Sequence, residues 1–409
     1  MLPNAAYVVS AKFAPGLMKE FGLLGDSLAR RGVHVRYLLA GRYESMGWDR
    51  PDTHYVAAPS GRGNIVLDTI RWMSGKKVDQ LFAESPPVVL YFYNTHPLNP
   101  LLAGMVKRRF SRASVIVHLH DPFKPDKAPY GRKGAWRIRI VEFVQKLTAM
   151  QADHAVFPSE YSLALFRTHY KRFSGGTHVA PLLIPDRSDD PVRPRIWFSM
   201  VGRMQRATGH ETFRDLVNHV AEKSLGYKFA LVCCDDLSRY LSKVTAPGRR
   251  LLTVINKPVI EDSVIDMVVK RSYATFRLAT EVTQSGVVPV AYMNRTPVIV
   301  RDIPGLHQHV RHKHDGYLVP ADCLPVHLLE AMEHVKTNFA RLSDNARHSY
   351  EETWSEANWD SCYGWLMQLL EGHETAPAKP QDRRVAIRGC AVSSVPDPGR
   401  RGEDPLLRH

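Results

Sequence analysis

The sequence lacks the features that mark membrane-spanning, secreted and disulfide-bonded proteins. It has no unbroken run of about 18 apolar residues, the length that a membrane-spanning helix needs. No basic lead-in precedes its short N-terminal apolar run, so we expect no secretion signal. The 5 cysteines form no Cys-x-x-Cys pair, which disfavours a zinc site and a disulfide framework. Together these absences predict a cytoplasmic protein with reduced thiols.

Common nucleotide and metal motifs are missing as well. There is no G-x-x-x-x-G-K-[ST] loop, and no G-x-G-x-x-G follows the first expected strand. These gaps disfavour a P-loop NTPase and a nicotinamide-dependent enzyme. There is no H-x-x-x-H pattern, and we interpret the acidic pairs Asp189-Asp190 and Asp235-Asp236 as linker and turn residues. We therefore expect no metal site.

The charge of the chain is large and unevenly distributed. Its 409 residues include 55 Lys and Arg against 41 Asp and Glu, a formal net charge of +14. The first 185 residues hold 25 basic and 13 acidic residues, and residues 101–150 alone hold 11 and 3. Such an excess suits an anionic membrane, a phosphorylated ligand or nucleic acid. No RNA-binding, zinc-finger or helix-turn-helix signature is present, so we expect no nucleic-acid partner.

Apolar residues interleave with this basic cluster at helical spacing. They are Trp136, Ile140, Phe143 (or Val144) and Leu147. Arg137, Arg139 and Lys146 lie beside them, which predicts a basic amphipathic helix. Two interpretations stay open: the apolar stripe lies on an anionic lipid surface, or it packs into the protein core.

Short apolar runs alternate with helical patterns through both halves of the chain. We expect strands at residues 5–10, 33–39, 88–93, 115–119 and 155–158, and again at 196–201, 228–234, 251–255, 273–276 and 297–300. This alternation predicts an α/β protein with parallel sheets covered by helices. The expected parts are a first domain at 1–185, a linker at 186–194, a second domain at 195–350, a helix at 351–371 and a disordered tail at 372–409.

Two stretches of the second domain favour an anionic ligand. Arg203 follows the first strand of this domain, where ligands of such sheets bind. Ser285 and Gly286 end a polar loop that runs into a helix. Backbone N–H groups at a helix N-terminus are suited to bind phosphate.

The order of these motifs resembles a known family. "VGRM", "TQSGVVPVAYMNRTPVIVRDIPGL" and "DGYLVP" are similar to the donor domain of family-4-like retaining glycosyltransferases of the GT-B fold. In the first domain, "FAPGLMKEFGLLGDSLARRGVHV", "VIVHLHDP" and "FPSEYSLALF" resemble that family, and "TWSEANWDSCYGWL" resembles its C-terminal helix region. The resemblance covers roughly residues 5–370.

The resemblance implies two Rossmann-like domains that face each other across a cleft, with a C-terminal helix returning to the first domain. The first domain would bind the acceptor and the second a nucleoside-diphosphate sugar, without a metal or other cofactor. Residues implied at the donor diphosphate are Arg203, Gln284, Ser285 and Gly286. His120 would lie near the reactive centre, with Asp121 orienting its loop, and Gly16 would line the phosphate and acceptor side. We also expect one of His118 and His120 to face away.

The sequence departs from the family pattern at several positions. Thr208 stands where the family usually has a lysine, with Arg206 nearby, and these two residues are further expected donor contacts. Val282 and Val290 occupy the positions of a glutamate pair, and Glu281 lies one position off as another expected contact. Gln308 stands where a glutamate is common. These changes put catalysis in question.

The expected function is that of a retaining, metal-independent hexosyltransferase. It would use a glycan or lipid-linked acceptor in bacterial-type surface polysaccharide biosynthesis, in the cytoplasm and peripherally on the inner membrane face. One alternative is a non-catalytic GT-B subunit that binds glycan or a partner. A more remote alternative is an epimerase or phosphorylase of the same fold.

Overall fold

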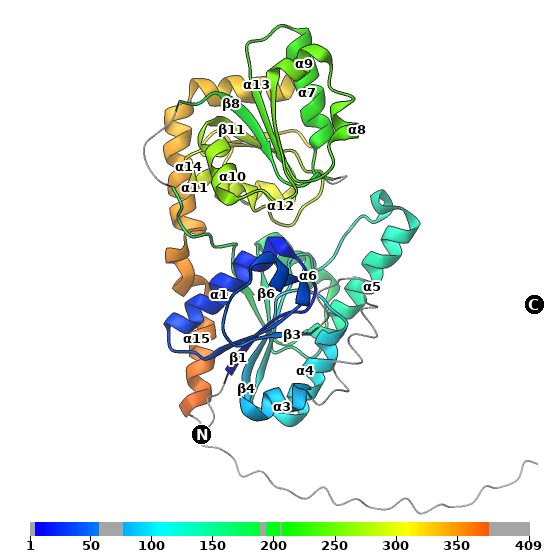
Figure 1. Ribbon diagram of the computed structural model, residues 1–409, viewed down its shortest axis with the longest axis vertical. Coiled ribbons are helices and arrows are strands. Elements are labelled where there is room, and N and C mark those ends of the chain that lie inside the picture. Colours follow the sequence, from blue (N-terminus) through cyan, green and yellow to red (C-terminus); the bar gives the residue numbers. More distant parts are fainter. Residues whose placement is uncertain (1–4, 57–76, 189–193, 205–206, 376–409) are drawn as a thin grey trace, which may run out of the picture.

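The computed structural model describes residues 5–56, 77–188, 194–204 and 207–375, which form two stacked domains (Figure 1). Each domain is built around one parallel sheet with helices on both faces. The expected tail at 372–409 falls almost wholly outside the described residues, and its first four residues continue the last helix. No helix in the described part of the chain is long and apolar enough to cross a membrane.

The first domain contains a seven-stranded sheet in which all neighbours are parallel. In spatial order its strands are β3 (Thr53–Tyr55), β2 (Val35–Leu39), β1 (Ala5–Ser10), β4 (Pro87–Phe92), β5 (Ser114–His118), β6 (His154–Phe157) and β7 (Gly176–Val179). Every residue of the central strand β1 is buried, as expected of a strand covered on both faces. The sequence patterns missed β3 and β7, which are short and only half-buried edge strands.

Helices cover both faces of this sheet. They are α1 (Met18–Arg30), α3 (Lys77–Glu84), α4 (Leu98–Arg109), α5 (Gly131–Ala149) and α6 (Glu160–His169). Single 3₁₀ turns lie at η1 (Pro15–Leu17), η2 (Gly41–Met46) and η3 (Ala128–Tyr130). Phe21, Leu24 and Leu28 of α1 are buried at helical spacing, which confirms the expected first helix.

The second domain repeats the plan with a six-stranded parallel sheet. In spatial order its strands are β10 (Leu252–Asn256), β9 (Phe229–Cys233), β8 (Trp197–Val201), β11 (Ser272–Arg277), β12 (Val298–Arg301) and β13 (Gly316–Val319). Its helices are α7 (His210–Glu222), α8 (Ser238–Leu241), α9 (Ala246–Leu251), α10 (Asp262–Lys270), α11 (Val287–Met293), α12 (Pro304–His307) and α13 (Pro325–Thr337). The expected α/β fold with two parallel-sheet domains is confirmed.

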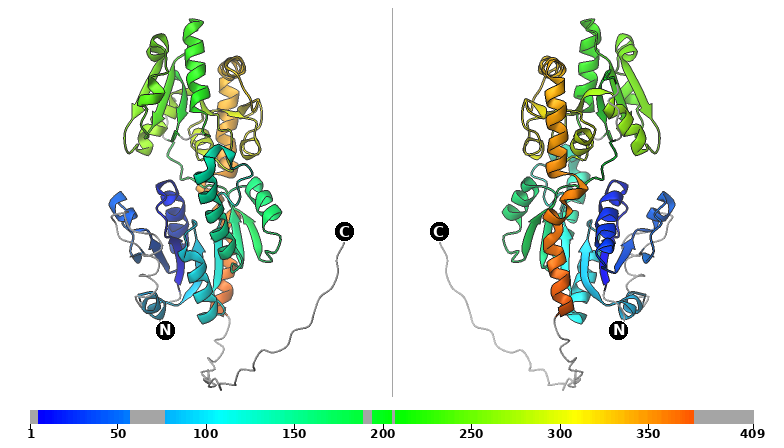
Figure 2. Two further views of the ribbon diagram at one scale, coloured as in Figure 1. Left: turned by 90° about the vertical axis from the view of Figure 1, so that its right-hand side faces the viewer. Right: turned by 90° about the vertical axis from the view of Figure 1, so that its left-hand side faces the viewer.

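The C-terminal segment joins the two domains along one side of the molecule (Figures 1 and 2). Helix α14 (Phe339–Thr353) packs on the second domain, and α15 (Trp359–Thr375) follows the turn η4 (Glu356–Asn358) down to the first. Trp359, Tyr363, Leu366 and Leu370 of α15 are buried in the same core as strand β1. The helix expected at 351–371 is therefore two helices with a break after Thr353.

The outgoing and returning chains touch where they cross between the domains. The backbone N–H of Ile184 donates to the carbonyl of Trp354 at 2.8 Å. The hydroxyl of Tyr350, which is fully buried, donates to the carbonyl of Ile184 at 2.8 Å. The Arg347 guanidinium pairs with Asp186, and these contacts tie the two crossing segments together.

Helix α5 turns part of its apolar stripe outward. Trp136 is 64% exposed and Phe143 60% exposed, and the adjacent basic side chains are exposed as well. The face that packs inward consists of Gln145, Thr148 and Ala149. The interpretation that the stripe packs into the core is wrong for Trp136 and Phe143, because the core accepts the polar and small face instead.

We expect Leu366→Ala to destabilise the whole chain by about 2–5 kcal/mol, since it removes a fully buried side chain from the core of the first domain. Gln368→Ala, on the exposed side of the same helix, is the matched control and leaves stability nearly unchanged. Urea unfolding followed by circular dichroism measures both. Equal stability of the two variants would show that α15 is dispensable for the first domain.

Candidate functional site

The loops that follow β5 and β11 meet between the two domains. The Gln284 amide lies 2.9 Å from His120 Nδ1. The Thr283 hydroxyl lies 2.7 Å from a carboxylate oxygen of Asp121 and 2.9 Å from the His120 carbonyl. The structure thus brings together Gln284 with both first-domain residues that the sequence placed at the reactive centre.

Further contacts hold the same loop of the second domain against the first. The Ser159 hydroxyl donates to the Thr283 carbonyl at 3.0 Å, and the Tyr161 N–H donates to the Gln308 side chain at 3.1 Å. Glu281, expected as a donor contact, accepts from the Tyr130 hydroxyl at 3.2 Å and lies 3.6 Å from Lys124 Nζ. Its carboxylate is therefore engaged in joining the domains.

His118 and His120 lie on the same side of the sheet. Their rings stack with centroids 4.3 Å apart and an interplanar angle of 8°. The expectation that one of them faces away is wrong, because residues two apart on an extended strand project to the same face. His118 Nδ1 lies 3.2 Å from the hydroxyl of Tyr91. This contact helps to fix the His118 ring, on which the ring of His120 stacks.

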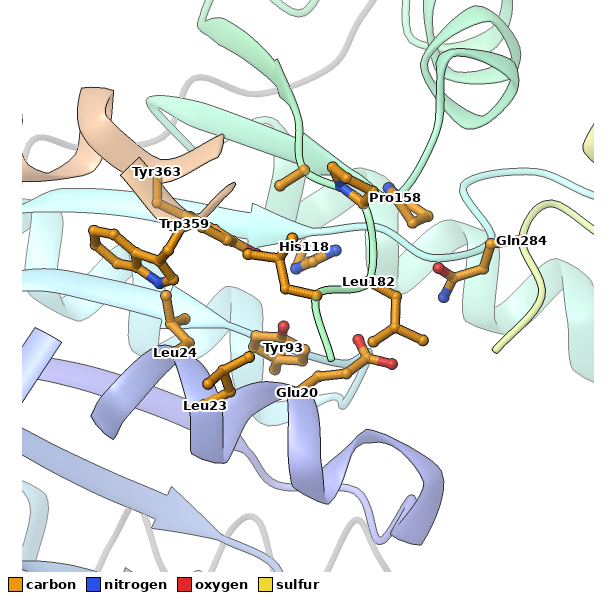
Figure 3. A pocket seen from close by; sticks show the side chains of 13 residues that line it. Glu20, Leu23, Leu24, Tyr93, His118, Pro158, Leu182, Gln284, Trp359 and Tyr363 are labelled. Carbon is orange, nitrogen blue, oxygen red and sulfur yellow. The ribbon is translucent and has the colours of Figure 1, made fainter. Parts of the chain in front are cut away.

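Glu20 of α1 faces this histidine and was not singled out by the sequence patterns. Figure 3 shows its carboxylate beside Tyr93 and Leu182, in a small pocket that is closed by Trp359 and Tyr363 of α15. Its Oε2 lies 3.9 Å from His120 Nε2, and the side chain is 9% exposed. Residues of α1, of the segment 180–183 that follows β7, and of α15 come together in the fold to bury this carboxylate.

Burial keeps both groups uncharged near neutral pH. Desolvation raises the pKa of Glu20 to about 8, so the carboxyl is largely protonated at pH 7. Desolvation also lowers the pKa of His120 to about 4, so its ring is neutral. With the Gln284 amide donating to Nδ1, the ring hydrogen lies on Nε2, the nitrogen nearest Glu20.

A larger cavity of about 430 Å³ opens beside Glu20 and is called the cleft pocket here. Gly16, Lys19 and Glu20 line it from the first domain, while Gly286 and Val290 line it from α11. A side chain at Gly16 would meet nothing within 4 Å, so the chain is open here to a ligand. The pocket brings Gly16 and Gly286 together, and their expected roles at the acceptor side and at the donor diphosphate stay predictions.

The remaining second-domain residues are placed differently. Arg203 is 65% exposed and forms an ion pair with Asp235 at 2.7 Å. Asp235, which we interpreted as a turn residue, is therefore the counter-ion of Arg203. Thr208 is buried and its hydroxyl lies 2.8 Å from His210 Nδ1. Ser285 is buried and accepts from the Val287 N–H at 3.3 Å, while Arg206 lies outside the described residues. The donor roles of these residues stay predictions.

Arg277 at the end of β11 is a second residue that the sequence patterns missed. Arg277 is half-buried, its buried Nε has no hydrogen-bond partner among the described residues, and desolvation lowers its pKa to about 10. Its charge helps to lower the pKa of His210, the histidine that touches Thr208. A cation therefore lies near the position of the missing lysine. A charged residue at the carboxyl end of an expected strand is the signal that would have found it.

The side chains of the described residues do not form a ready-made metal site. No group of three or more His, Cys, Asp or Glu residues there is arranged to hold a metal ion. Arg203, Arg277 and the polar loop at 281–286 are among the described groups that can meet an anionic ligand.

We expect the stability of the wild-type chain to fall between about pH 5 and pH 8 relative to Glu20→Gln. In the unfolded chain Glu20 ionises freely, but in the folded chain it stays protonated until the pH reaches its pKa of about 8. The free energy of unfolding therefore falls as the pH rises through this range. Urea unfolding at pH 5.5, 7 and 8.5 measures the difference. Glu44→Gln, at an exposed position, is the control, and parallel curves for wild type and Glu20→Gln would refute the buried neutral acid.

Comparison with known proteins gives a family match in the first domain. Residues 16–182 match the family described as "Glycosyl transferase 4-like domain". No curated protein matches the sequence.

Solved structures resemble the chain over nearly its whole length. Sucrose-phosphate synthase from Thermosynechococcus elongatus gives a TM-score of 0.70 at 15% identity, covering 91% of this chain and 100% of that one. HepE from Anabaena, solved in complex with UDP, gives 0.66 at 13% identity, with 90% and 100% covered. WaaG, a glycosyltransferase involved in lipopolysaccharide biosynthesis, gives 0.65 at 15% identity, with 88% and 100% covered. Residues 16–182 of the first domain therefore resemble the glycosyl transferase 4-like family, and the chain as a whole has the GT-B fold.

Proposed function

We propose that this protein is a retaining glycosyltransferase that moves a hexose from a nucleoside-diphosphate sugar to a glycan or lipid-linked acceptor. The proposal includes a cytoplasmic location and a role in bacterial-type surface polysaccharide biosynthesis. The observation that carries it is the closure of Thr283 and Gln284 onto His120 and Asp121 next to the cleft pocket. Two domains that meet in this way can hold a donor and an acceptor at one reactive centre.

The chemistry requires stabilisation of the nucleoside diphosphate as it leaves the sugar. Preorganised cations and N–H donors lower the barrier of such a step. Arg203 provides an exposed cation that can exchange Asp235 for a phosphate, and Arg277 provides a half-buried cation near Thr208. Gly286, which lines the cleft pocket at the start of α11, offers its backbone to the diphosphate. His120 is neutral and therefore suited to contact the sugar as a hydrogen-bonding group.

We further propose that transfer needs no divalent metal, because the arginines supply the positive charge. Addition of EDTA should then leave the rate unchanged. A rate that falls on chelation and returns with magnesium or manganese would contradict this part of the proposal.

The exposed stripe of α5 supports a peripheral membrane location. Trp136 and Phe143 project outward from a helix whose Arg132, Arg137 and Arg139 are exposed. Aromatic side chains partition into the interfacial layer, and each basic residue near an anionic leaflet contributes about 1 kcal/mol. A lipid-linked acceptor would then meet the first domain at the surface in which it is embedded.

A non-catalytic GT-B subunit is the second candidate, and two positions favour it. Val290 lines the cleft pocket where the family has a glutamate, so no carboxylate is present at this point to bind ribose hydroxyls. Thr208 hydrogen-bonds His210 and offers no charge in place of the lysine. Such a subunit would bind a nucleotide or glycan without turnover.

The first experiment on these two candidate functions measures the binding of nucleotide sugars. A bound donor stabilises only the folded chain, so a thermal-shift screen of UDP and GDP sugars should raise the melting temperature for the true donor. A transfer assay with that donor and lipid or glycan acceptors then separates the enzyme from the binding subunit. Binding without hydrolysis or transfer to any acceptor would favour the subunit.

We expect Arg203→Ala to abolish transfer and to weaken UDP binding about tenfold or more, through loss of a charge-assisted phosphate contact. The side chain is exposed, so circular dichroism should report an unchanged fold. Lys223→Ala, exposed at the far end of α7, is the matched control and keeps full activity. Unchanged turnover in Arg203→Ala would remove this residue from the diphosphate site.

We expect a Trp136→Ser and Phe143→Ser double variant to lose most of its binding to phosphatidylglycerol vesicles in co-sedimentation. Each large apolar side chain contributes about 1.5–3 kcal/mol when it leaves water. A Val259→Ser and Val326→Ser double variant removes equally exposed apolar groups from the second domain and should bind like wild type. Equal binding to phosphatidylcholine vesicles, or no effect of the first pair, would contradict membrane docking by α5.

A further inference from the structure

The small pocket beside Glu20, shown in Figure 3, is called the Glu20 pocket here. Its volume is about 10 Å³, which is close to the space that one water molecule or one hydroxyl group needs. Glu20 of the first domain and Gln284 of the second domain both line it. The proposed chemistry leaves this pocket and Glu20 without a role.

The Glu20 pocket adjoins the larger cleft pocket. Four residues line both cavities, namely Glu20, Leu23, Leu182 and Leu183. Glu20 therefore lies at the boundary between them. A ligand that occupies the cleft pocket can extend one small group past Glu20 into the Glu20 pocket.

His120 provides a hydrogen-bond donor without a partner beside Glu20. The Gln284 amide donates to His120 Nδ1 at 2.9 Å, which leaves the ring hydrogen on Nε2. This Nε2 is buried and has no hydrogen-bond partner among the described residues. An unpaired buried donor costs about 1–3 kcal/mol. A ligand oxygen that accepts from His120 Nε2 would remove this cost.

The distance between Glu20 and His120 fits one bridging oxygen atom. Glu20 Oε2 lies 3.9 Å from His120 Nε2, which is too long for a direct hydrogen bond. Two hydrogen bonds of about 2.8 Å span such a gap when they meet at about 90° on one oxygen. A hydroxyl group suits this position, because it accepts from the histidine and forms a second hydrogen bond with the carboxyl group.

The surroundings of Glu20 favour an uncharged group over an anion. Leu23, Leu24, Leu183 and Trp359 form apolar walls of the pocket. Burial raises the pKa of Glu20 to about 8, so its own carboxyl group is largely uncharged at pH 7. A hydroxyl group avoids the desolvation cost that a phosphate or a carboxylate would have here. A volume of about 10 Å³ also excludes these larger groups.

We propose that Glu20 is a specificity-determining residue that binds one hydroxyl group of a sugar substrate in the Glu20 pocket, together with His120. The hydroxyl group belongs either to the hexose of the nucleotide sugar or to a sugar of the acceptor. In both cases the pocket selects a sugar with a free hydroxyl group at one position against the analogue that lacks it. This inference rests on the proposed transferase function, since it requires a sugar in the cleft pocket.

The first test is calorimetric titration of the full chain with UDP-glucose, UDP-N-acetylglucosamine and GDP-mannose, and with UDP and GDP as probes without a sugar. For a donor hydroxyl, Glu20→Leu should weaken binding of a nucleotide sugar about tenfold or more and binding of its bare nucleotide less than about twofold. Glu20→Gln keeps a hydrogen-bonding side chain of similar size and should recover most of the lost affinity. Glu44→Leu, at an exposed position of η2, is the matched control and should alter neither affinity.

Deoxy sugars separate a hydroxyl contact from a structural role of Glu20. One monodeoxy analogue of the bound nucleotide sugar should bind wild type about tenfold more weakly than the parent sugar, whereas Glu20→Leu should not distinguish the two. For an acceptor hydroxyl, Glu20→Leu should leave nucleotide-sugar binding unchanged. It should then raise the KM for octyl glucoside as acceptor about tenfold at nearly constant kcat, with recovery in Glu20→Gln.

Two results would overturn the proposal. One is an equal loss of nucleotide and nucleotide-sugar binding in Glu20→Leu, which indicates a structural role. The other is no selective effect of Glu20→Leu on either substrate, as expected of a pocket that holds only water.

Failure of the proposed function gives a different result. A chain that binds none of these nucleotides or sugars and transfers nothing refutes the transferase, and with it this role of Glu20. A chain in which wild type and Glu20→Leu bind and transfer sugars equally well leaves the transferase standing and overturns only the role of Glu20.

Discussion

The double crossing of the chain at Ile184 and Trp354 is the constraint on which the rest of the structure depends. Two segments far apart in sequence are joined there by one backbone hydrogen bond, and the Tyr350 hydroxyl adds a second contact between them. Each domain alone contains a sheet whose ligand-binding edge is open. Because both connections lie on one side, they hold the carboxyl edges of the two sheets facing each other. The site depends on this geometry more than on any single residue within it.

The polar contacts that join the domains across the cleft are weaker than those at the double crossing. Thr283 and Gln284 reach the first domain through a few hydrogen bonds, and Glu281 adds an ion pair that is partly open to solvent. Contacts of this kind are individually weak. The apolar packing of α15 on the first sheet buries whole side chains and therefore joins the domains more strongly than these polar contacts do.

The sequence predicted most strands with continuous apolar runs, because burial on both faces leaves a direct pattern, but it missed the mostly buried edge strand β13. Strands β3 and β7 lie at the sheet edge, where half of the strand stays exposed and the pattern fades. The loop at 281–286 and its partners His120 and Asp121 could be found because their motifs occur in the order that the family resemblance predicts. Glu20 could not be found, since its burial depends on residues 180–183 and on α15, which lie far away in sequence. The outward face of α5 was also undecidable, because periodicity shows a stripe and not what covers it.

The return of α15 has a consequence for how the protein is made. The first domain leaves the ribosome early, yet its core stays incomplete until Trp359, Tyr363 and Leu366 have been synthesised. Large chains usually fold domain by domain as they emerge. Here the domain that emerges first completes its core last. The apolar groove that α15 covers in the folded protein is therefore exposed on the nascent chain through most of translation. Premature termination after the second domain would release a chain with that groove still open, a natural target for chaperones and proteases.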